Sequence, residues 1–207
     1  MAKTAKAAPD KSAAAELKSF TNGAGAHPNF SFTRYWWDGD GPRDGIKSWV
    51  EKKLAPGEDP VFGKAAKSEV LIPDAASSDY AEAGFLLEQF DTKLPAFERH
   101  AFIQVKITLE ESISWTAGYE KVRAYAREHF VGDGHPVIIV AHVPGAAGSA
   151  NANHVHIIVL SRTLGINGFG QTNHTLCSDR GHGHAWEMWG RGTRHSSSAT
   201  KASSAQH

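Results

Sequence analysis

The chain of 207 residues has little cysteine and no long apolar run. The single cysteine, Cys177, cannot form a disulfide within the chain, which excludes a disulfide-built scaffold and fits a reducing cytoplasm. No apolar run approaches the roughly 20 residues of a membrane-spanning helix, and the N-terminus lacks the apolar segment of a secretory signal. The sequence therefore predicts a cytoplasmic protein with no membrane partner.

Net charge is also absent, because 22 Lys and Arg residues balance 22 Asp and Glu residues. A neutral chain is not expected to coat nucleic acid by bulk charge, although a local basic groove remains compatible with it. No GxxxxGK[ST] phosphate-binding loop is present, which excludes an ATP-driven helicase of that type. The hydrophobic content of 41% and the length instead fit one globular domain with a single core.

Both ends of the chain differ in composition from its middle. Residues 1–14 are rich in Ala and Lys without apolar periodicity, and residues 195–207 (HSSSATKASSAQH) are small and polar. Such segments bury too little apolar surface to fold by themselves. We expect a flexible arm at 1–14, one domain at 15–194 and a disordered tail at 195–207.

Hydrophobic periodicity predicts both helices and strands. In the first half, the expected elements are a short helix at 13–20, a strand at 30–36, a helix at 46–54, a short strand or loop at 69–72, and a helix from 78 to about 95. In the second half they are a strand at 103–109, a helix at 115–130, a strand at 136–143, a loop at 144–153 and a strand at 154–161. This order predicts an α+β fold, with a central, largely antiparallel sheet flanked by helices and flexible tails at both ends.

Histidine is abundant, with 12 residues, and three of them fall in the last two predicted strands. His154 and His156 are two residues apart in one strand, so their side chains point to the same side. His142 ends the preceding strand and lies beside them if the two strands pair antiparallel. Backbone partners could satisfy these imidazoles, but burying them unpaired in an apolar strand is costly. We therefore favour a three-histidine metal site with coordination positions left for water or substrate.

The stretch from Asn153 to Leu160 (NHVHIIVL), preceded by a strand ending in His142, resembles the histidine–hydrophobe–histidine signature of HUH endonucleases. Within that superfamily it is most similar to MobA/MobL-type mobilisation relaxases, as are the later stretches SRTLGINGFG and LCSDRG. The resemblance covers roughly residues 98–190.

The resemblance implies a bacterial enzyme that nicks and rejoins single-stranded or hairpin DNA at a plasmid or mobile-element origin, with accessory mobilisation proteins as further partners. In such enzymes three histidines, here His142, His154 and His156, hold one divalent ion, Mg²⁺ or Mn²⁺. A tyrosine hydroxyl attacks the scissile phosphate and forms a 5′-phosphotyrosine.

The chain has four tyrosines and none follows the His-x-His motif. Since relaxases place the nucleophile near the N-terminus, on a helix after the first strand, the resemblance makes Tyr35 the candidate. Tyr35 lies in a predicted strand (FSFTRYWW) and equally suits a core aromatic or a stacking platform for bases. If Phe20 occupies the nucleophile position, the chain is a DNA-binding module without a nucleophile. A metal hydrolase that activates water is a third hypothesis, for which we see no carboxylate base beside the motif.

Several basic residues are candidates for contacts with DNA. We expect Lys106, Arg162 and Arg180 to bind phosphate groups, although scattered basic residues also occur on any solvated surface. A second His-x-His pattern, at 182–184, is flanked by glycines and predicts surface histidines in a loop.

Overall fold

Six antiparallel strands form one sheet in the computed structural model, which describes residues 15–39, 41–43, 45–57, 64–95 and 97–203. The strand order is β1-β2-β4-β6-β5-β3, and every neighbouring pair is antiparallel. The strands are β1 (Glu16–Asn22), β2 (Phe30–Asp38), β3 (Lys67–Leu71), β4 (His100–Thr108), β5 (Val137–His142) and β6 (His154–Leu160). The expected α+β fold with a central antiparallel sheet is confirmed.

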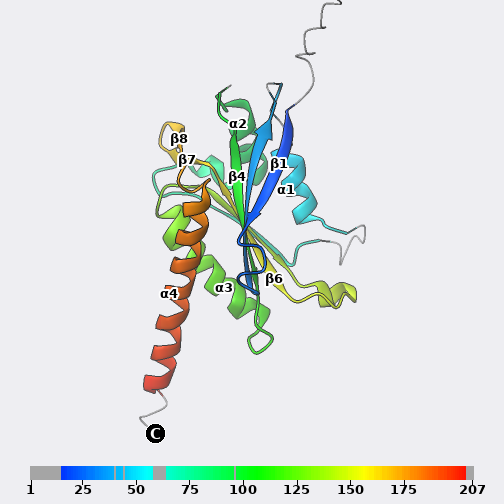
Figure 1. The fold of residues 1–207 in the computed structure, drawn as a ribbon, viewed down its shortest axis with the longest axis vertical. Helices are drawn as coiled ribbons and strands as arrows, with labels where there is room; N and C mark the ends of the chain where they lie inside the picture. The colour runs from blue at the N-terminus through cyan, green and yellow to red at the C-terminus, as the bar shows by residue number, and fades with distance from the viewer. Residues whose placement is uncertain (1–14, 40, 44, 58–63, 96, 204–207) are drawn as a thin grey trace, which may run out of the picture.

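Helices cover both faces of this sheet (Figure 1). One face packs against α1 (Ile46–Leu54) and α2 (Ala83–Thr92), the latter preceded by the short 3₁₀ helix η1 (Ser78–Ala81). The opposite face packs against α3 (Trp115–Ala126), which continues into the π-helical turn η2 (Arg127–Val131), and against the start of α4 (Asp179–Ser203). The remaining elements are the 3₁₀ turn η3 (Pro144–Ala147) and the hairpin of β7 (Arg162–Gly165) and β8 (Gly168–Thr172).

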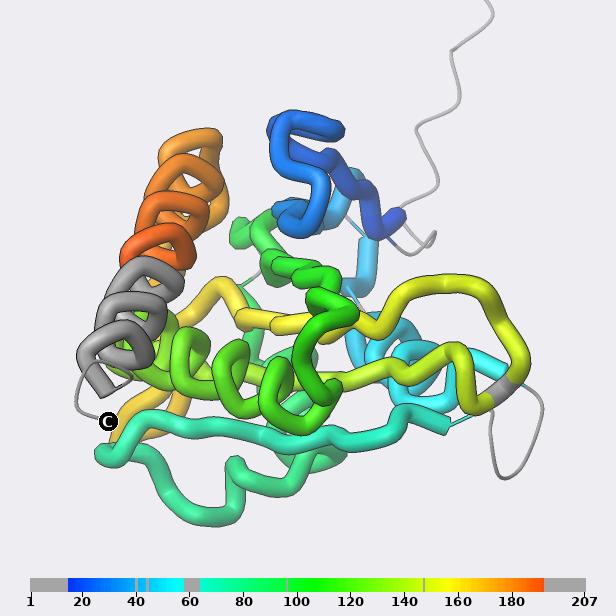
Figure 2. The backbone as a smooth tube through the Cα atoms, turned by 90° about the horizontal axis from the view of Figure 1, so that it is seen from below, coloured from blue at the N-terminus to red at the C-terminus, as the bar shows by residue number. Residues whose placement is uncertain are grey.

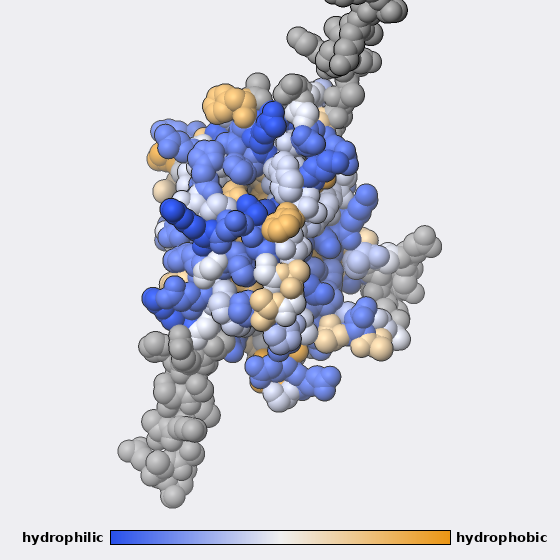
Figure 3. Space-filling view, in the orientation of Figure 1, coloured by the Kyte–Doolittle hydropathy of each residue, from blue (hydrophilic) through white to orange (hydrophobic). Residues whose placement is uncertain are grey.

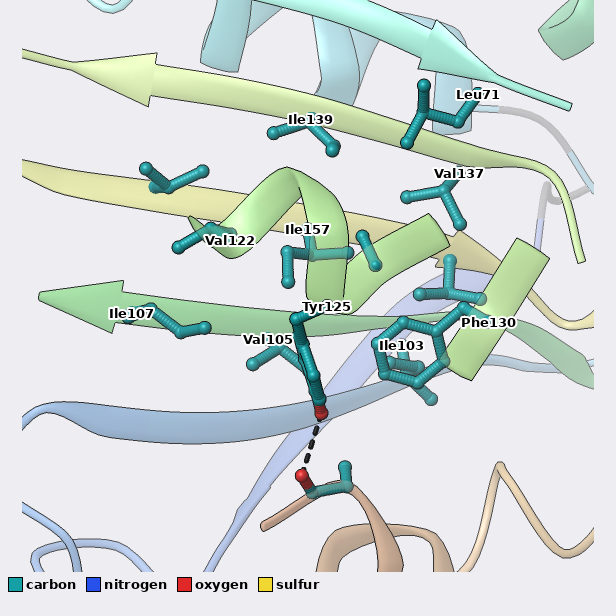
Figure 4. Close-up of a cluster of buried hydrophobic side chains, with 14 of the residues drawn as sticks. Leu71, Ile103, Val105, Ile107, Val122, Tyr125, Phe130, Val137, Ile139 and Ile157 are labelled. Atoms are coloured by element: carbon teal, nitrogen blue, oxygen red, sulfur yellow. Dashed lines mark hydrogen bonds between the residues drawn. The ribbon is translucent and has the colours of Figure 1, made fainter. Parts of the chain in front are cut away.

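The central strands are buried on both sides, which explains their nearly continuous apolar sequences. In β6, Val155, Ile157 and Val159 face α3, whereas Ile158 and Leu160 face α1 and α2. Figure 4 shows the α3 side, where Tyr125 lies among aliphatic side chains and its hydroxyl donates a hydrogen bond of 2.7 Å to the Ala185 carbonyl of α4. The two cores fix the sheet between helical layers and leave the strand ends accessible.

A short helix was predicted at 13–20, but residues 16–20 instead belong to the edge strand β1, which runs from Glu16 to Asn22. It pairs with β2 along its whole length, from Glu16 opposite Asp38 to Asn22 opposite Phe32. Gly23, with φ +56°, opens the turn that joins the two strands, a conformation that glycine adopts without steric cost. Pairing with a long neighbouring strand thus overrides a weak local helix preference.

The glycine-flanked histidines at 182–184 lie in the first turns of α4, whereas a loop was expected. Gly181 explains the difference, because a Cβ at this position would lie 2.1 Å from the Leu176 carbonyl oxygen. The glycine therefore allows the start of α4 to pack closely against the Leu176 backbone and does not break the helix.

The expected terminal segments fall partly outside the described residues. The proposed arm at 1–14 is not described, nor are residues 204–207 of the proposed tail, whereas residues 195–203 continue α4. None of the described helices combines the length and hydropathy that crossing a membrane requires. The face seen in Figure 3 is mostly hydrophilic, with hydrophobic residues exposed in small separate patches.

An ion pair fastens the edge strand β3 to α3. The Glu69 carboxylate accepts two hydrogen bonds of 2.6 Å from the Arg123 guanidinium and one of 3.2 Å from the Tyr119 hydroxyl, and Arg123 lowers the pKa of Glu69. We expect Glu69→Gln to lower the free energy of unfolding by about 1–2 kcal/mol in urea denaturation at neutral pH. The exposed helical pair of Glu187 and Arg191 is the control, where Glu187→Gln should cost less than about 0.5 kcal/mol. Equal losses in both variants would contradict a special role for Glu69.

Candidate metal centre

The sheet register brings the three predicted histidines together. His142 is opposite His154 in the β5–β6 pairing, and His156 follows two residues later on the same face of β6. The three ring centroids are 5.0–5.1 Å apart. One ligand nitrogen from each ring lies within 4.8 Å of the others, which is the spacing that a shared metal ion needs.

Backbone carbonyls fix the orientation of two of these rings. His142 Nε2 lies 2.7 Å from the Lys53 carbonyl oxygen, and His154 Nδ1 lies 2.9 Å from the Ala152 carbonyl oxygen. Because a carbonyl only accepts, both nitrogens must carry the proton in the neutral rings. The remaining nitrogens, His142 Nδ1 and His154 Nε2, then face each other across 3.2 Å with two lone pairs and no proton between them.

Two lone pairs in contact repel, and a cation between them removes the repulsion. The carbonyl partners are those that metal-binding histidines use to set ring orientation and tautomer. His156 adds a buried Nδ1 without a hydrogen-bond partner among the described residues. The donor set therefore fits one divalent ion, and three imidazole nitrogens favour a transition metal such as Mn²⁺ over Mg²⁺.

The surroundings keep all three imidazoles neutral, the form that binds a metal. Burial lowers the pKa of each histidine below 6.5, and the positive charges of Lys53 and Lys106 lower it further. The effect is largest at His156, whose side chain is almost fully buried and whose pKa falls to about 2.

A cavity of about 460 Å³ opens over the histidines. Besides them it is lined by Trp49, Lys52, Lys53, Pro56, Lys106 and Asn151. These residues come from α1, β4 and the loop before β6, and Figure 2 shows that loop extending past the sheet on the side of α1. No carboxylate and no tyrosine is among the lining residues described, so the cavity has cations and one indole ring but no acidic base.

Sequence reasoning did not identify the contribution of α1 to this site. The apolar periodicity of α1 predicted the helix correctly, and Ile46 and Val50 are buried as expected. The same helix places Trp49, Lys52 and Lys53 at the cavity, at the i, i+3 and i+4 spacing of one helical face. That spacing indicates that the three side chains share one face of α1, but the sequence does not show that this face lies beside the histidines.

Tyr35 lies in β2, away from the cavity. Its ring stacks on Phe102, with 4.3 Å between centroids, and contacts the edge of Trp49 at 5.0 Å. In the strand register Tyr35 is opposite Phe102, four residues from Lys106, which is opposite His156. With about 3.3 Å per residue and 4.8 Å per strand, its Cα is roughly 16 Å from that of His156. Burial also raises the pKa of Tyr35, which does not favour the phenolate.

The other tyrosines have structural partners. Tyr119 and Tyr125 donate hydrogen bonds to Glu69 and to the Ala185 carbonyl, and Tyr80 is buried beside Phe85 and Phe169. Phe20 lies in β1 and not on a helix, and the residue is 53% exposed beside a different cavity. The alternative in which Phe20 replaces the nucleophile placed it on a helix, whereas the described residues around Phe20 form a strand.

The three predicted DNA contacts occupy different surroundings. Lys106 lies in the histidine cavity. The Arg162 guanidinium is buried and donates hydrogen bonds to the carbonyls of Lys93, Phe169 and Gly170, which holds the β7–β8 hairpin in place. Arg180 is exposed in the first turn of α4. Of these residues, only Lys106 is placed beside the metal centre.

Comparison with known proteins shows a structural likeness. No family model and no curated protein sequence matches the chain. A solved structure described as "Molecular Basis of Vancomycin Resistance Transfer in Staphylococcus aureus" matches with a TM-score of 0.58 and 13% sequence identity. The match covers 87% of this chain and 90% of the other. At this identity the likeness shows the fold alone, and it agrees with the α+β fold expected from the sequence.

The buried histidines make the metal-free protein sensitive to acid. Because the pKa of His156 is far below 6.5 in the folded chain and near 6.5 in the unfolded chain, the unfolded state binds more protons as the pH falls below about 6.5. We expect the free energy of unfolding in EDTA to fall with pH, and His156→Asn to reduce this slope by up to about 1.4 kcal/mol per pH unit. Urea titrations between about pH 7 and 5 measure both slopes. Equal slopes would contradict the burial of a neutral His156.

Proposed function

We propose that this chain is a relaxase-like protein that binds single-stranded DNA at the origin of a mobile element and holds one phosphodiester at a divalent metal ion. The observation that carries the proposal is the pair of imidazole nitrogens facing each other across 3.2 Å inside a cavity lined by lysines. A metal ion there would polarise the non-bridging oxygens of a bound phosphate.

The residues around the histidines suit a nucleic acid strand. Lys52, Lys53 and Lys106 offer ammonium groups to the phosphate oxygens, which compensates for the neutral charge of the whole chain. Trp49 offers the flat ring on which an unpaired base can stack. The Lys53 ammonium lies over that ring, 5.1 Å from its centre, so a base that stacks there would displace the ammonium toward a neighbouring phosphate.

Nicking and rejoining through a phosphotyrosine is the second candidate function, and the relaxase-like fold over most of the chain favours it. In this reaction the Tyr35 phenol oxygen would bond to phosphorus and the bond to the 3′ oxygen would break. The phenol proton would pass to the leaving 3′ oxygen, giving a 5′-phosphotyrosine and a free 3′-hydroxyl. The place of Tyr35 behind Trp49 requires a rearrangement of α1 before this attack, and for that reason strand binding is our first candidate.

Two assays on the same samples test both candidates. Labelled single-stranded oligonucleotides that tile the region upstream of the gene, and duplexes of the same sequence, are titrated with protein in Mn²⁺ or EDTA, and anisotropy reports binding. Each mixture is then denatured and run on a gel to detect label that stays on the protein. We expect Mn²⁺ to tighten single-strand binding at least about tenfold over EDTA.

The outcomes separate the candidates. Equal affinity in Mn²⁺ and EDTA would overturn the proposed role of the metal centre. A metal-dependent adduct that Tyr35→Phe abolishes would establish nicking through Tyr35. Metal-dependent binding without an adduct or cleavage would leave strand binding as the function, and cleavage without an adduct would indicate attack by metal-activated water.

A further inference from the structure

A second cluster of potential metal ligands lies at the opposite end of β4. Glu98, His100 and His174 each offer one ligand atom, and these three atoms lie within 4.8 Å of one another. The cluster joins two distant parts of the chain, because His100 begins β4, Glu98 precedes that strand by two residues, and His174 is in the segment between β8 and α4. Sequence reasoning assigned no role to these residues.

The protonation states in this cluster suit a cation. Glu98 is only 6% exposed, yet contacts with Thr172, His100 and Arg99 outweigh its burial and lower its pKa, so the carboxylate is ionised. Its Oε1 accepts a hydrogen bond of 2.8 Å from the His100 backbone N–H. Burial lowers the pKa of His100, which keeps that imidazole neutral.

The geometry of the two rings leaves room for a shared ion. The rings of His100 and His174 meet edge to face with 5.3 Å between centroids, close to the spacing of the rings at the first centre. Two imidazoles and one carboxylate are a ligand set that Zn²⁺ and similar transition metals use, with one or more positions left open.

A cavity lies beside this cluster. His100 lines a cavity of about 760 Å³ whose other lining residues include Arg34, Arg99 and Trp36. This cavity is separate from the one over the first centre. His100 is six residues from Lys106 along β4, a distance of about 20 Å, so the two clusters cannot share an ion.

We propose that Glu98, His100 and His174 form a second metal centre that takes a transition-metal ion of the Zn²⁺ class. Bound there, the ion ties the segment that leads into α4 to the first residues of β4. This position connects the sheet with the segment that leads into the long helix, where the Asn173 N–H also donates a hydrogen bond to the Ser161 carbonyl.

Metal stoichiometry tests this centre independently of the proposed function. Untagged full-length protein is stripped with chelator, dialysed against Zn²⁺, and analysed for bound metal. We expect two Zn²⁺ per wild-type chain, one in His174→Ala and one in the double variant His142→Ala/His154→Ala. His174 is exposed, so its removal should leave the fold intact, which circular dichroism checks, and the exposed His184→Ala is the matched control with two ions.

Each outcome decides the proposal. A His174→Ala protein that retains as many ions as the wild type overturns it. Loss of one ion in His174→Ala, with none lost in His184→Ala, supports it. If the wild type binds one ion that only His174→Ala removes, the second centre stands and the first fails. If the wild type binds one ion and only the double variant loses it, the first centre stands and the second fails. A rise in melting temperature with Zn²⁺ in the double variant, absent when His174→Ala is added to that double variant, provides a second readout.

Discussion

Replacing His154 with alanine should weaken metal binding at the three-histidine centre by at least about 100-fold. Loss of a partner outside the ligand set already costs about 10- to 100-fold in such sites, and His154 is placed as a ligand itself. Its Nε2 faces His142 Nδ1 across 3.2 Å, so its removal also leaves His142 without the opposing nitrogen. With the metal lost, binding of single-stranded DNA should become insensitive to EDTA.

His154 is the suitable position for this test because its side chain is only half-buried, whereas His156 is almost fully buried and its loss would disturb the core. Calorimetric titration of the chelator-stripped protein with Mn²⁺ measures the affinity, and His184→Ala, which changes an exposed histidine in α4, serves as the control. Because the proposed second centre could also bind metal, the measurement is repeated in a His174→Ala background. An unchanged affinity for Mn²⁺ in His154→Ala would show that the facing nitrogens are not a metal site.

The histidine cluster could be predicted from the sequence because it depends on local rules. The period of two along a strand places His154 and His156 on one face, and the short connection between β5 and β6 favours antiparallel pairing. The observed register then brings His142 opposite His154. Local signals also predicted α1 and α3 from the helical period of their apolar residues, and β5 and β6 from short, nearly continuous apolar runs.

Features that depend on long-range contacts could not be predicted in this way. Lys53 reaches His142 across 89 positions of the sequence, and His174 reaches His100 across the whole second half of the domain. Residues 16–22 form the strand β1 because they pair with β2 along its length. No local sequence pattern predicts these long-range contacts.

Residue type alone also gave a misleading view of the basic residues. Arg162 and Lys106 are equal candidates for phosphate contacts in the sequence, yet three backbone carbonyls occupy the guanidinium of Arg162, whereas Lys106 faces the histidine cavity. Whether a cation is available to a ligand depends on the carbonyls around it, and those belong to segments distant in the sequence.

Replacing Trp49 with leucine should weaken binding of single-stranded DNA by about 5- to 150-fold. Stacking of one base on an aromatic ring contributes about 1–3 kcal/mol, and among the described residues that line the histidine cavity Trp49 is the only aromatic residue besides the three histidines. Leucine keeps an apolar side chain against Tyr35 and Phe102, so α1 should stay docked on the sheet. Affinity for Mn²⁺ should not change, because Trp49 supplies no ligand atom.

Trp36→Leu makes the same substitution at the separate cavity beside His100 and is the matched control. Fluorescence anisotropy in Mn²⁺, with the same oligonucleotide for all proteins, compares the three affinities. If Trp36→Leu weakens binding as much as Trp49→Leu, the strand is not localised at the three-histidine centre.

Trp49→Leu also tests Tyr35 as the nucleophile, since it removes the ring between Tyr35 and the cavity. If nicking proceeds through Tyr35, the variant should form adducts faster per bound strand, whereas a binding module should form none in either protein.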